Sequence, residues 1–261
     1  MQIPVDLIDL VLSADHVVAL TGAGVSAESG IPTFRDAMTG LWAMYQAEEL
    51  ATPEAFRRNP SLVWNWYQWR KQLVLEKSPN AGHVAIKELS DIVSRFSLIT
   101  QNVDGLHQKA GSRNVIELHG NIRRSICFDN RHLQEEAEGA GLMDVDFDIE
   151  SNHEPPPECP QCGSMLRPDV IWFGEALNPG YLNAASEAAM TCEVFFSIGT
   201  SSLVHPAASL AEFAKHSGAR IVEVNPNPTP LTPIVDYALH GAGGEVLPEL
   251  VSRLQAANGQ G

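Results

Sequence analysis

The chain has 261 residues and an apolar share of 44%, which suits one large globular domain or two modest ones. No stretch approaches the roughly 20 apolar residues that cross a bilayer, so we predict no membrane contact. The formal net charge of −15 repels phosphate backbones and argues against direct binding of nucleic acid. The same charge favours basic partners such as lysine-rich peptides, although an acidic surface can also serve solubility alone.

The N-terminal segment, residues 1–12, carries Asp6 and Asp9 and no basic residue. A secretory signal begins with positive charge and a transit peptide is rich in arginine, so neither leader is predicted. We therefore expect a cytoplasmic protein. In a cytosolic chain, four cysteines do not indicate a disulfide framework.

Short apolar runs rich in β-branched residues predict buried parallel strands at 16–20, 97–100, 115–118, 194–198 and 220–224. Helix-like segments lie between them, for example at 83–94 and 206–217. This alternation predicts an α/β fold, a Rossmann-like, doubly wound parallel sheet covered on both faces.

Two regions interrupt the alternation. Residues 39–78 hold all but one of the five tryptophans and read as helical. Residues 121–167 hold three of the four cysteines, an acidic stretch and three consecutive prolines, a composition that does not suit a central strand. We expect 39–78 and 121–167 to form a small inserted domain, part helical and part zinc-ribbon-like. Residues 1–38, 79–120 and 168–261 would then form the Rossmann-like domain.

A glycine-rich segment follows the first predicted strand. Gly22, Gly24 and Ala27 match the G-x-G-x-x-G/A fingerprint, in which glycines permit a tight turn and close approach to a pyrophosphate. The helix that follows would offer the free N–H groups of its N-terminus to that charge. A dehydrogenase would place an acidic residue at the end of a second strand about 20 residues on, but residues 32–42 have no strand pattern. The segment therefore predicts a dinucleotide put to a use other than hydride transfer, although glycine-rich strand ends also occur without a ligand.

Polar side chains follow two neighbouring predicted strands. Gln101, Asn102 and Asp104 come after one strand, and His119 ends the next. Any one of them alone would most simply be a cap or a surface residue. Because ligands of doubly wound sheets bind at the carboxyl ends of the strands, four such groups together predict a site.

Six sequence blocks resemble those of the sirtuins, in the order of that family and over nearly the whole chain; they are 22–35, 101–107, 117–120, 172–175, 199–202 and 224–225. The resemblance implies a protein-lysine deacylase that consumes NAD and gives free lysine, nicotinamide and O-acyl-ADP-ribose. It implies acylated lysines of proteins as substrates and, in many members, a monomer. A mono-ADP-ribosyltransferase on the same fold is the alternative, and a non-catalytic NAD-binding scaffold is a third.

The resemblance also assigns roles to residues. Asn102 and Asp104 would hold the nicotinamide ribose and orient the reaction. His119 would be the general base, a task that suits an imidazole because its ordinary pKa is near neutrality. The remaining cofactor contacts would come from Gly22, Ala23, Gly24, Phe34, Arg35, Gln101, Gly199, Thr200, Ser201, Asn225, Asn227 and Gly243.

Tyr67 and Arg70 bear on substrate choice. Three residues apart on a helix, they share a face, and together they can hold a carboxylate. Alone the pair would be an ordinary surface pair. Here it resembles the acid-binding signature of the sirtuin class, with bacterial members, that includes lysine desuccinylases and demalonylases. Ala51 resembles the small pocket residue of that class, and the positions of Val170, Phe173 and Gly174 also match substrate-binding positions.

Cysteines in the second insertion predict a metal site. Cys159 and Cys162 have the spacing of a metal-binding knuckle. Sirtuins usually carry two such pairs, but after Cys127 this chain has Asn130 where the resemblance implies a cysteine. Structural zinc takes four ligands. Either the set is completed by Asp129, His132 or His153, or the metal is lost. We expect Cys192 to be a core residue.

Overall fold

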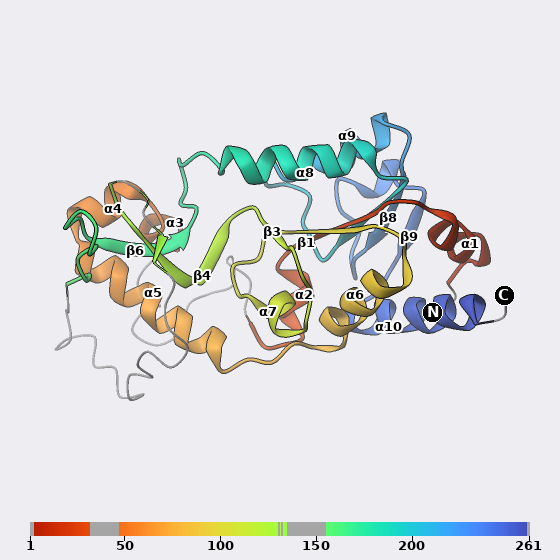
Figure 1. Ribbon diagram of the computed structural model, residues 1–261, viewed down its shortest axis with the longest axis horizontal. Helices are drawn as coiled ribbons and strands as arrows, with labels where there is room; N and C mark the ends of the chain where they lie inside the picture. Colours follow the sequence, from red (N-terminus) through yellow and green to blue (C-terminus); the bar gives the residue numbers. More distant parts are fainter. Residues whose placement is uncertain (1–2, 32–46, 130, 132, 135–154, 260–261) are drawn as a thin grey trace.

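The computed structural model describes residues 3–31, 47–129, 131, 133–134 and 155–259. Its main feature is a sheet of six parallel strands in the order β3-β2-β1-β7-β8-β9 (Figure 1). The strands are β1 Val17–Thr21, β2 Phe96–Thr100, β3 Ile116–Glu117, β7 Val194–Ile198, β8 Arg220–Val224 and β9 Tyr237–Leu239. The sheet grows outward from β1 in one direction and from β7 in the other. Ligands of doubly wound sheets bind beside such a reversal, at the carboxyl ends of the strands.

Helices cover both faces of this sheet (Figure 1). One face carries α1 Val5–Ser13, α6 Ala81–Ile92 and α10 Gly243–Asn258, and the other carries α8 Pro179–Thr191 and α9 Ser209–His216. Alternate residues of β1 supply both cores, with Val17 and Ala19 in one and Val18 and Leu20 in the other. Burying each Val or Leu contributes about 1.5–3 kcal/mol, which is why the strand is a continuous apolar run. Short elements in the connections are α2 Gly24–Ala27, α7 Leu106–Lys109 and the 3-10 helix Thr232–Ile234.

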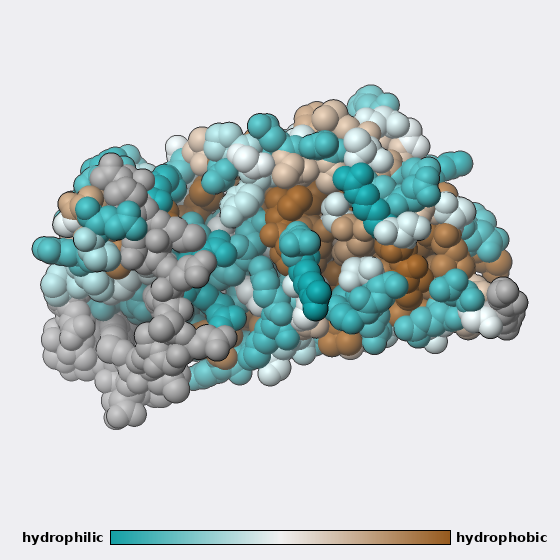
Figure 2. Space-filling view, in the orientation of Figure 1, coloured by the Kyte–Doolittle hydropathy of each residue, from teal (hydrophilic) through white to brown (hydrophobic). Residues whose placement is uncertain are grey.

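A small antiparallel sheet has the strand order β5-β4-β6, from β4 Gly120–Cys127, β5 Leu133–Gln134 and β6 Leu166–Val170. Beside it lie α3 Ala47–Leu50, α4 Pro53–Arg58 and α5 Pro60–Leu75 (Figure 1). These helices and β4 and β6 share one hydrophobic cluster, which includes Phe56, Trp66 and Trp172. On the face that Figure 2 shows, the described surface of this part is mostly hydrophilic, whereas hydrophobic patches interrupt the surface over the parallel sheet.

Helices α4 and α5 begin at residues that the sequence marks clearly. Thr52 and Asn59 accept hydrogen bonds from the backbone N–H groups of Ala55 and Leu62, at 3.1 Å in each case. Pro53 and Pro60 then take the first helical positions, where a missing N–H costs nothing. The caps fix where α5 begins, and so which of its residues face the small sheet.

The structure confirms the predicted fold class. The five predicted strands are present within two residues of their expected ends, and the helices α6 and α9 match the two helix-like segments. The described residues of 121–167 give the parallel sheet no strand, as expected, but β4, which is eight residues long and central in the small sheet, was not predicted. The three-residue β9 was not predicted either. Within the described residues, no helix has both the length and the apolar character needed to cross a membrane.

Candidate active site

Gly22, Gly24 and Gly199 lie where the loops after β1 and β7 touch, a contact that we call the glycine crossing. The N–H of Gly24 donates to the carbonyl of Gly199 at 2.8 Å. A Cβ on Gly24 would lie 2.7 Å from that oxygen, and one on Gly22 would lie 2.8 Å from it. Gly199 has φ +59, and a Cβ there would lie 2.5 Å from the nitrogen of Val25. Only glycine fits at this crossing, so backbone alone lines the point where the sheet reverses.

The helix after the glycine loop differs from the expectation. α2 has only four residues. The N–H groups of Gly22, Val25 and Ser26 donate to the carbonyls of Ile198, Gly22 and Ala23 at 3.0–3.1 Å, and the N–H of Gly24 is also used within the protein. The prediction that a helix N-terminus offers these groups to a pyrophosphate is therefore wrong for these four amides.

Amide and hydroxyl side chains surround the glycine crossing. The Nε2 of Gln101 donates to the Oγ1 of Thr200 at 3.1 Å, and the Nδ2 of Asn225 donates to the carbonyl of Thr200 at 2.9 Å. Ser201 is exposed beside them. Asn227 donates its backbone N–H to the Oδ1 of Asn225 at 3.4 Å. Such groups suit the hydroxyls and phosphates of a dinucleotide, and the residues present fit NAD.

The three remaining candidates for cofactor binding are Gly243, Phe34 and Arg35. Gly243 begins α10, and a Cβ there would meet Ile198 and Val25 at 3.6 Å, which is ordinary contact. Phe34 and Arg35 lie outside the described residues.

Asn102 and Asp104 meet at Ser26. The Nδ2 of Asn102 donates to the carbonyl of Gly22 at 3.0 Å and to the Oγ of Ser26 at 3.1 Å. The hydroxyl of Ser26 donates in turn to the Oδ2 of Asp104 at 2.7 Å. The other oxygen of Asp104 accepts the N–H of Leu106 at 2.9 Å, which fixes the start of α7. Both predicted residues are thus held at the end of β1 as well as at the end of their own strand.

Two buried histidines lie beneath this network. The Nε2 of His107 lies 2.9 Å from the Oγ1 of Thr21, and the ring centres of His83 and His107 are 4.9 Å apart. Burial lowers the pKa of His107 to about 3, and the neighbouring His83 acts in the same direction. Burial also lowers the pKa of His83, although Asp104 opposes that shift. Within the described part of the chain, the Nδ1 of His107 is buried without a hydrogen-bond partner.

His119 lies where the two sheets join. Its carbonyl accepts the N–H of Ile171 at 3.0 Å, and the next residue, Gly120, has φ +83 with no room for a Cβ beside Asp169. The Nδ1 of His119 lies 3.0 Å from the carbonyl oxygen of Gln101. A carbonyl only accepts, so Nδ1 carries the proton and Nε2 is left as the basic nitrogen. Burial lowers the pKa of His119, partly offset by this hydrogen bond. The imidazole is therefore neutral at physiological pH.

The predicted substrate residues gather in the cluster beside the small sheet. Ala51, Tyr67 and Val170 are buried members of it. The N–H of Phe173 donates to the carbonyl of Ala51 at 2.9 Å, and the Phe173 ring is half exposed. Gly174 follows with φ +84 and open space around its Cα.

Tyr67 and Arg70 lie on the same helix, α5. Burial raises the pKa of Tyr67 to about 12, so its phenol is protonated. The guanidinium carbon of Arg70 lies 5.0 Å from the centre of the Trp66 ring, and burial lowers the pKa of this partly buried arginine. The hydroxyl of Tyr67, which carries a proton to donate, and the desolvated guanidinium of Arg70 therefore lie on one face of α5.

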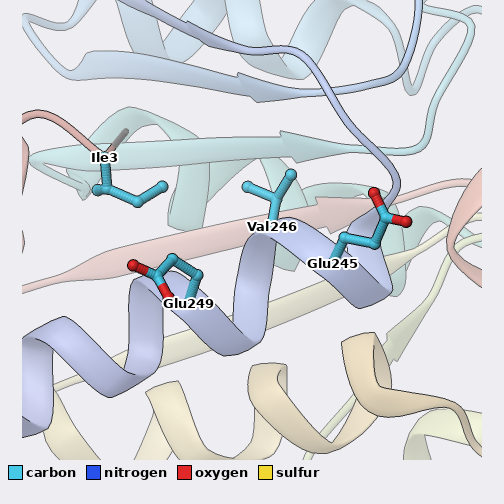
Figure 3. Close-up of a pocket in the computed structure, with 4 residues that line it drawn as sticks. All are labelled: Ile3, Glu245, Val246 and Glu249. Carbon is cyan, nitrogen blue, oxygen red and sulfur yellow. The ribbon is translucent and has the colours of Figure 1, made fainter. Parts of the chain in front are cut away.

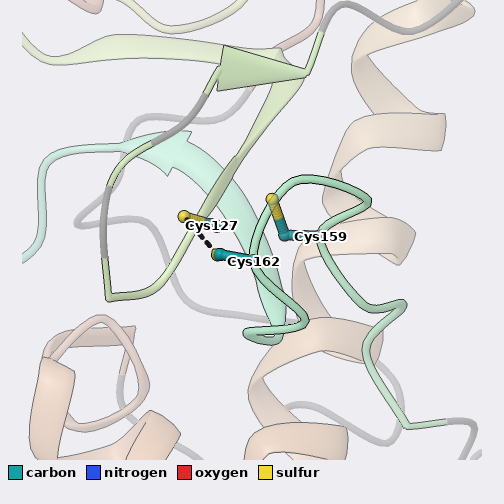
Figure 4. A group of neighbouring side chains, drawn as sticks. All are labelled: Cys127, Cys159 and Cys162. Atoms are coloured by element: carbon teal, nitrogen blue, oxygen red, sulfur yellow. Dashed lines mark hydrogen bonds between the residues drawn. The ribbon is translucent and has the colours of Figure 1, made fainter.

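The three predicted metal ligands come together. The sulfurs of Cys127, Cys159 and Cys162 all lie within 4.8 Å of one another, and those of Cys127 and Cys162 are 3.8 Å apart (Figure 4). Among the described residues this is the one group of three or more that is suited to a metal. Three thiolates are a partial ligand set for structural zinc. Asp129 is described and is not part of the group, while Asn130, His132 and His153 lie outside the described residues. Cys192 is buried in the main core, as expected.

A pocket of about 380 Å³ lies along α10 (Figure 3). It is lined by Ile3, Glu245, Val246 and Glu249, none of which is a predicted site residue. Glu249 accepts a hydrogen bond from Arg253 at 2.7 Å, so one of the two carboxylates already has a partner.

Sequence analysis missed several residues that build the site. Ser26 lies within the recognised block 22–35, but its contacts with Asn102 and Asp104 depend on the fold and leave no local signal. His83 reads as a helical surface residue, yet it is fully buried and closes the capping box of α6 with Asn80. Trp172 belongs to a recognised block, but its contact with Tyr67 depends on the fold and leaves no local signal.

The carboxyl edge of the parallel sheet thus defines a Rossmann-like protein with a dinucleotide site and a neutral histidine beside it. The model of the Sir2 family matches residues 22–206, and the chain belongs to that family.

Relatives align over almost the whole chain. An NAD-dependent protein deacylase 2 of Pyrobaculum aerophilum is 49% identical, covering 95% of this chain and 94% of that protein. An NAD-dependent protein deacylase 1 of Pseudomonas aeruginosa is 47% identical, with coverage of 95% and 97%. A crystal structure of a Sir2 homologue–NAD complex superposes with a TM-score of 0.87 at 46% identity, covering 98% and 95%. A Sir2 bound to an acetylated peptide superposes with a TM-score of 0.79 at 29% identity, covering 95% and 97%.

Proposed function

We propose that this protein is an NAD-dependent protein-lysine deacylase that releases free lysine, nicotinamide and O-acyl-ADP-ribose. The observation that carries the proposal is the state of His119, whose Nδ1 is held by the carbonyl of Gln101 so that Nε2 is basic. This nitrogen lies at the same sheet edge as Asn102, Asp104 and the glycine crossing. The names of the relatives and the solved complex with NAD support the same chemistry.

The chain's own residues then have separate tasks. When bound, NAD supplies a ribose carbon that takes the acyl oxygen of the substrate as nicotinamide leaves. The glycine crossing, Thr200 and Asn225 would hold the dinucleotide. The amide of Asn102 and the carboxylate of Asp104, both anchored through Ser26, would orient the ribose. His119 would take a proton from a ribose hydroxyl at Nε2. No serine or cysteine nucleophile is needed, because the substrate's own carbonyl oxygen attacks.

We also propose that the enzyme accepts acidic acyl groups such as malonyl and succinyl. A carboxylate needs donors that are already desolvated, since these gain most from a charged partner. The protonated phenol of Tyr67 and the guanidinium of Arg70 meet that need on one face of α5. The small side chain of Ala51 leaves room in the same cluster for a longer acyl chain.

The test uses one peptide that carries acetyl-, malonyl- or succinyl-lysine. We expect each acyl group to be removed only with NAD, with one nicotinamide released per lysine freed. His119→Ala should lower the rate by about 10²–10⁴-fold, the usual cost of losing a general base. His216→Ala, which removes an exposed imidazole on α9, is the matched control and should leave the rate unchanged.

Near-normal activity of His119→Ala would refute the assignment of the base. Label from the adenosine part of NAD that stays on protein, without deacylation, would instead indicate mono-ADP-ribosyl transfer. Neither the geometry nor the relatives named above offers an observation in favour of that transfer or of a non-catalytic scaffold.

We further propose that the substrates are acylated lysines of proteins, as supported by the Sir2 structure with an acetylated peptide. The division into 1–38, 79–120 and 168–261 on one side and 39–78 and 121–167 on the other is also a proposal. The shared hydrophobic cluster of the second part supports it. A monomeric state, the lack of nucleic-acid binding and a cytoplasmic location stay predictions.

A further inference from the structure

The hydroxyl of Tyr67 has a defined polarity. The Nε1–H of Trp172 points at its oxygen, 3.0 Å away, and both rings are at most 2% exposed. An indole N–H can only donate, so the phenolic oxygen accepts. The single proton of Tyr67 is then available to an acceptor elsewhere. Trp172 thereby makes Tyr67 a donor toward whatever occupies this part of the cluster.

Arg70 is also only a donor, because a guanidinium has no acceptor. It lies one turn after Tyr67 on α5. Without Trp172, the oxygen of Tyr67 could accept from this guanidinium and turn its own proton away. With Trp172 in place, the proton of Tyr67 and the guanidinium of Arg70, three residues apart on one face of α5, would together suit an anion with two oxygens. A neutral acyl chain such as acetyl gains nothing from this arrangement.

Trp172 is held from three sides. The guanidinium carbon of Arg167 lies 3.3 Å from the centre of its ring. Its backbone N–H donates to the Oε2 of Glu175 at 2.8 Å, and Arg167 binds the same carboxylate at 2.6 and 2.9 Å. The rings of Tyr67 and Phe56 pack against the indole, with centres 6.2 and 5.4 Å away. The direction of the indole N–H is therefore fixed before any substrate binds.

We infer that Trp172 is a positioning residue for selectivity toward acidic acyl groups, acting by holding Tyr67 as a donor to the acyl carboxylate. The inference rests on the proposed function, since it assumes that such acyl groups bind here. Arg167 and Glu175 contribute by keeping the indole in place.

The experiment is a double-mutant cycle read out as selectivity, the ratio of kcat/KM for succinyl-lysine to that for acetyl-lysine on one peptide. Trp172→Phe keeps an aromatic ring but removes the N–H. It should lower the ratio by about threefold to tenfold, the worth of one hydrogen bond. Tyr67→Phe should lower it at least as much, and adding Trp172→Phe to Tyr67→Phe should lower it no further. Trp64→Phe removes a different buried indole N–H, from α5, and should leave the ratio unchanged.

Poor folding of a variant lowers both rates together and leaves the ratio as it was, so the readout is specific. If Tyr67→Phe lowers the ratio and Trp172→Phe does not, the positioning role is wrong while the acidic-acyl function stands. If the double variant lowers the selectivity ratio by the product of the two single effects, the positioning role of Trp172 is also wrong. If neither Tyr67→Phe nor Arg70→Met changes the ratio, or if succinyl-lysine is not a substrate, the acidic-acyl function itself fails and the inference fails with it.

Discussion

Removing the charge of Glu175 should destabilise the protein far more than its position in a loop suggests. Glu175 accepts hydrogen bonds from both terminal nitrogens of Arg167, from Arg131 at 2.7 Å and from the backbone of Trp172. The side chain of Arg167 is only 1% exposed. Burial alone would raise the pKa of Glu175, but its contacts with Arg167 hold the pKa below its usual value, which shows that the carboxylate is the bound form.

Glu175→Gln leaves the Arg167 cation buried without a counter-charge, a change that typically costs about 3–5 kcal/mol. For a chain of this size each kcal/mol corresponds to roughly 2–4 °C in melting temperature, so a loss of about 6–20 °C is expected. Arg131→Gln is the matched control on the same carboxylate. Arg131 is 47% exposed, and such pairs are worth about 0–1 kcal/mol.

The assay is urea and thermal unfolding followed by tryptophan fluorescence, since Trp172 lies against Arg167. Glu175→Gln should shift both midpoints strongly, and Arg131→Gln should hardly move them. Equal and small shifts for the two variants would show that the buried pair contributes no more than a surface pair, and the reasoning about desolvation would be refuted.

Four further outcomes are expected. The acid limb of the kcat/KM profile should lie below pH 6.5, since burial lowers the pKa of His119 and the base must be neutral; a midpoint above 7 would contradict this. Arg70→Met should lower kcat/KM for succinyl-lysine tens- to thousands-fold, for about 2–5 kcal/mol, and spare acetyl-lysine; parallel losses would point to a structural role. Between pH 6.5 and about 3 the unfolded chain binds a proton that folded His107 does not. The free energy of unfolding should therefore decrease by about 1.4 kcal/mol for each unit by which the pH is lowered in this range. His107→Gln should flatten that slope in urea titrations. Metal analysis should find about one zinc per chain, and Cys159→Ser should lower stability more than the rate per folded molecule; a few hundredths of a zinc would show that the site is vestigial.

The strands of the main sheet were predictable because their signal is local. A strand buried on both faces is a continuous apolar run, and β7 and β8 match their predicted bounds to the residue. β4 has no such run. Its Arg124 pairs with Glu117 of β3 at 2.7 Å and with Asp169 of β6 at 2.8 Å. A charged residue whose partners lie on other strands is not recognised as part of a strand from its own sequence neighbourhood.

The same distinction holds at the site. Gln101, Asn102, Asp104 and His119 could be placed together from topology alone, because they follow adjacent strands. Ser26 gains its role from the two side chains that reach it from another strand. The hydrogen bond between Trp172 and Tyr67 joins residues from opposite halves of the chain. The hydrophobic periodicity of the sequence around either residue does not predict it.

The strand order has a consequence for how the protein is made. Val17 of the central strand pairs with Phe96 on one side and with Val194 on the other. Ribosomes add about 5–20 residues per second, so roughly 9–35 seconds separate the synthesis of β1 from that of its second neighbour. Throughout that interval at least one edge of the apolar strand β1 lacks its partner. The period of greatest risk of edge-to-edge aggregation therefore falls before release from the ribosome, and it ends only when β7 arrives.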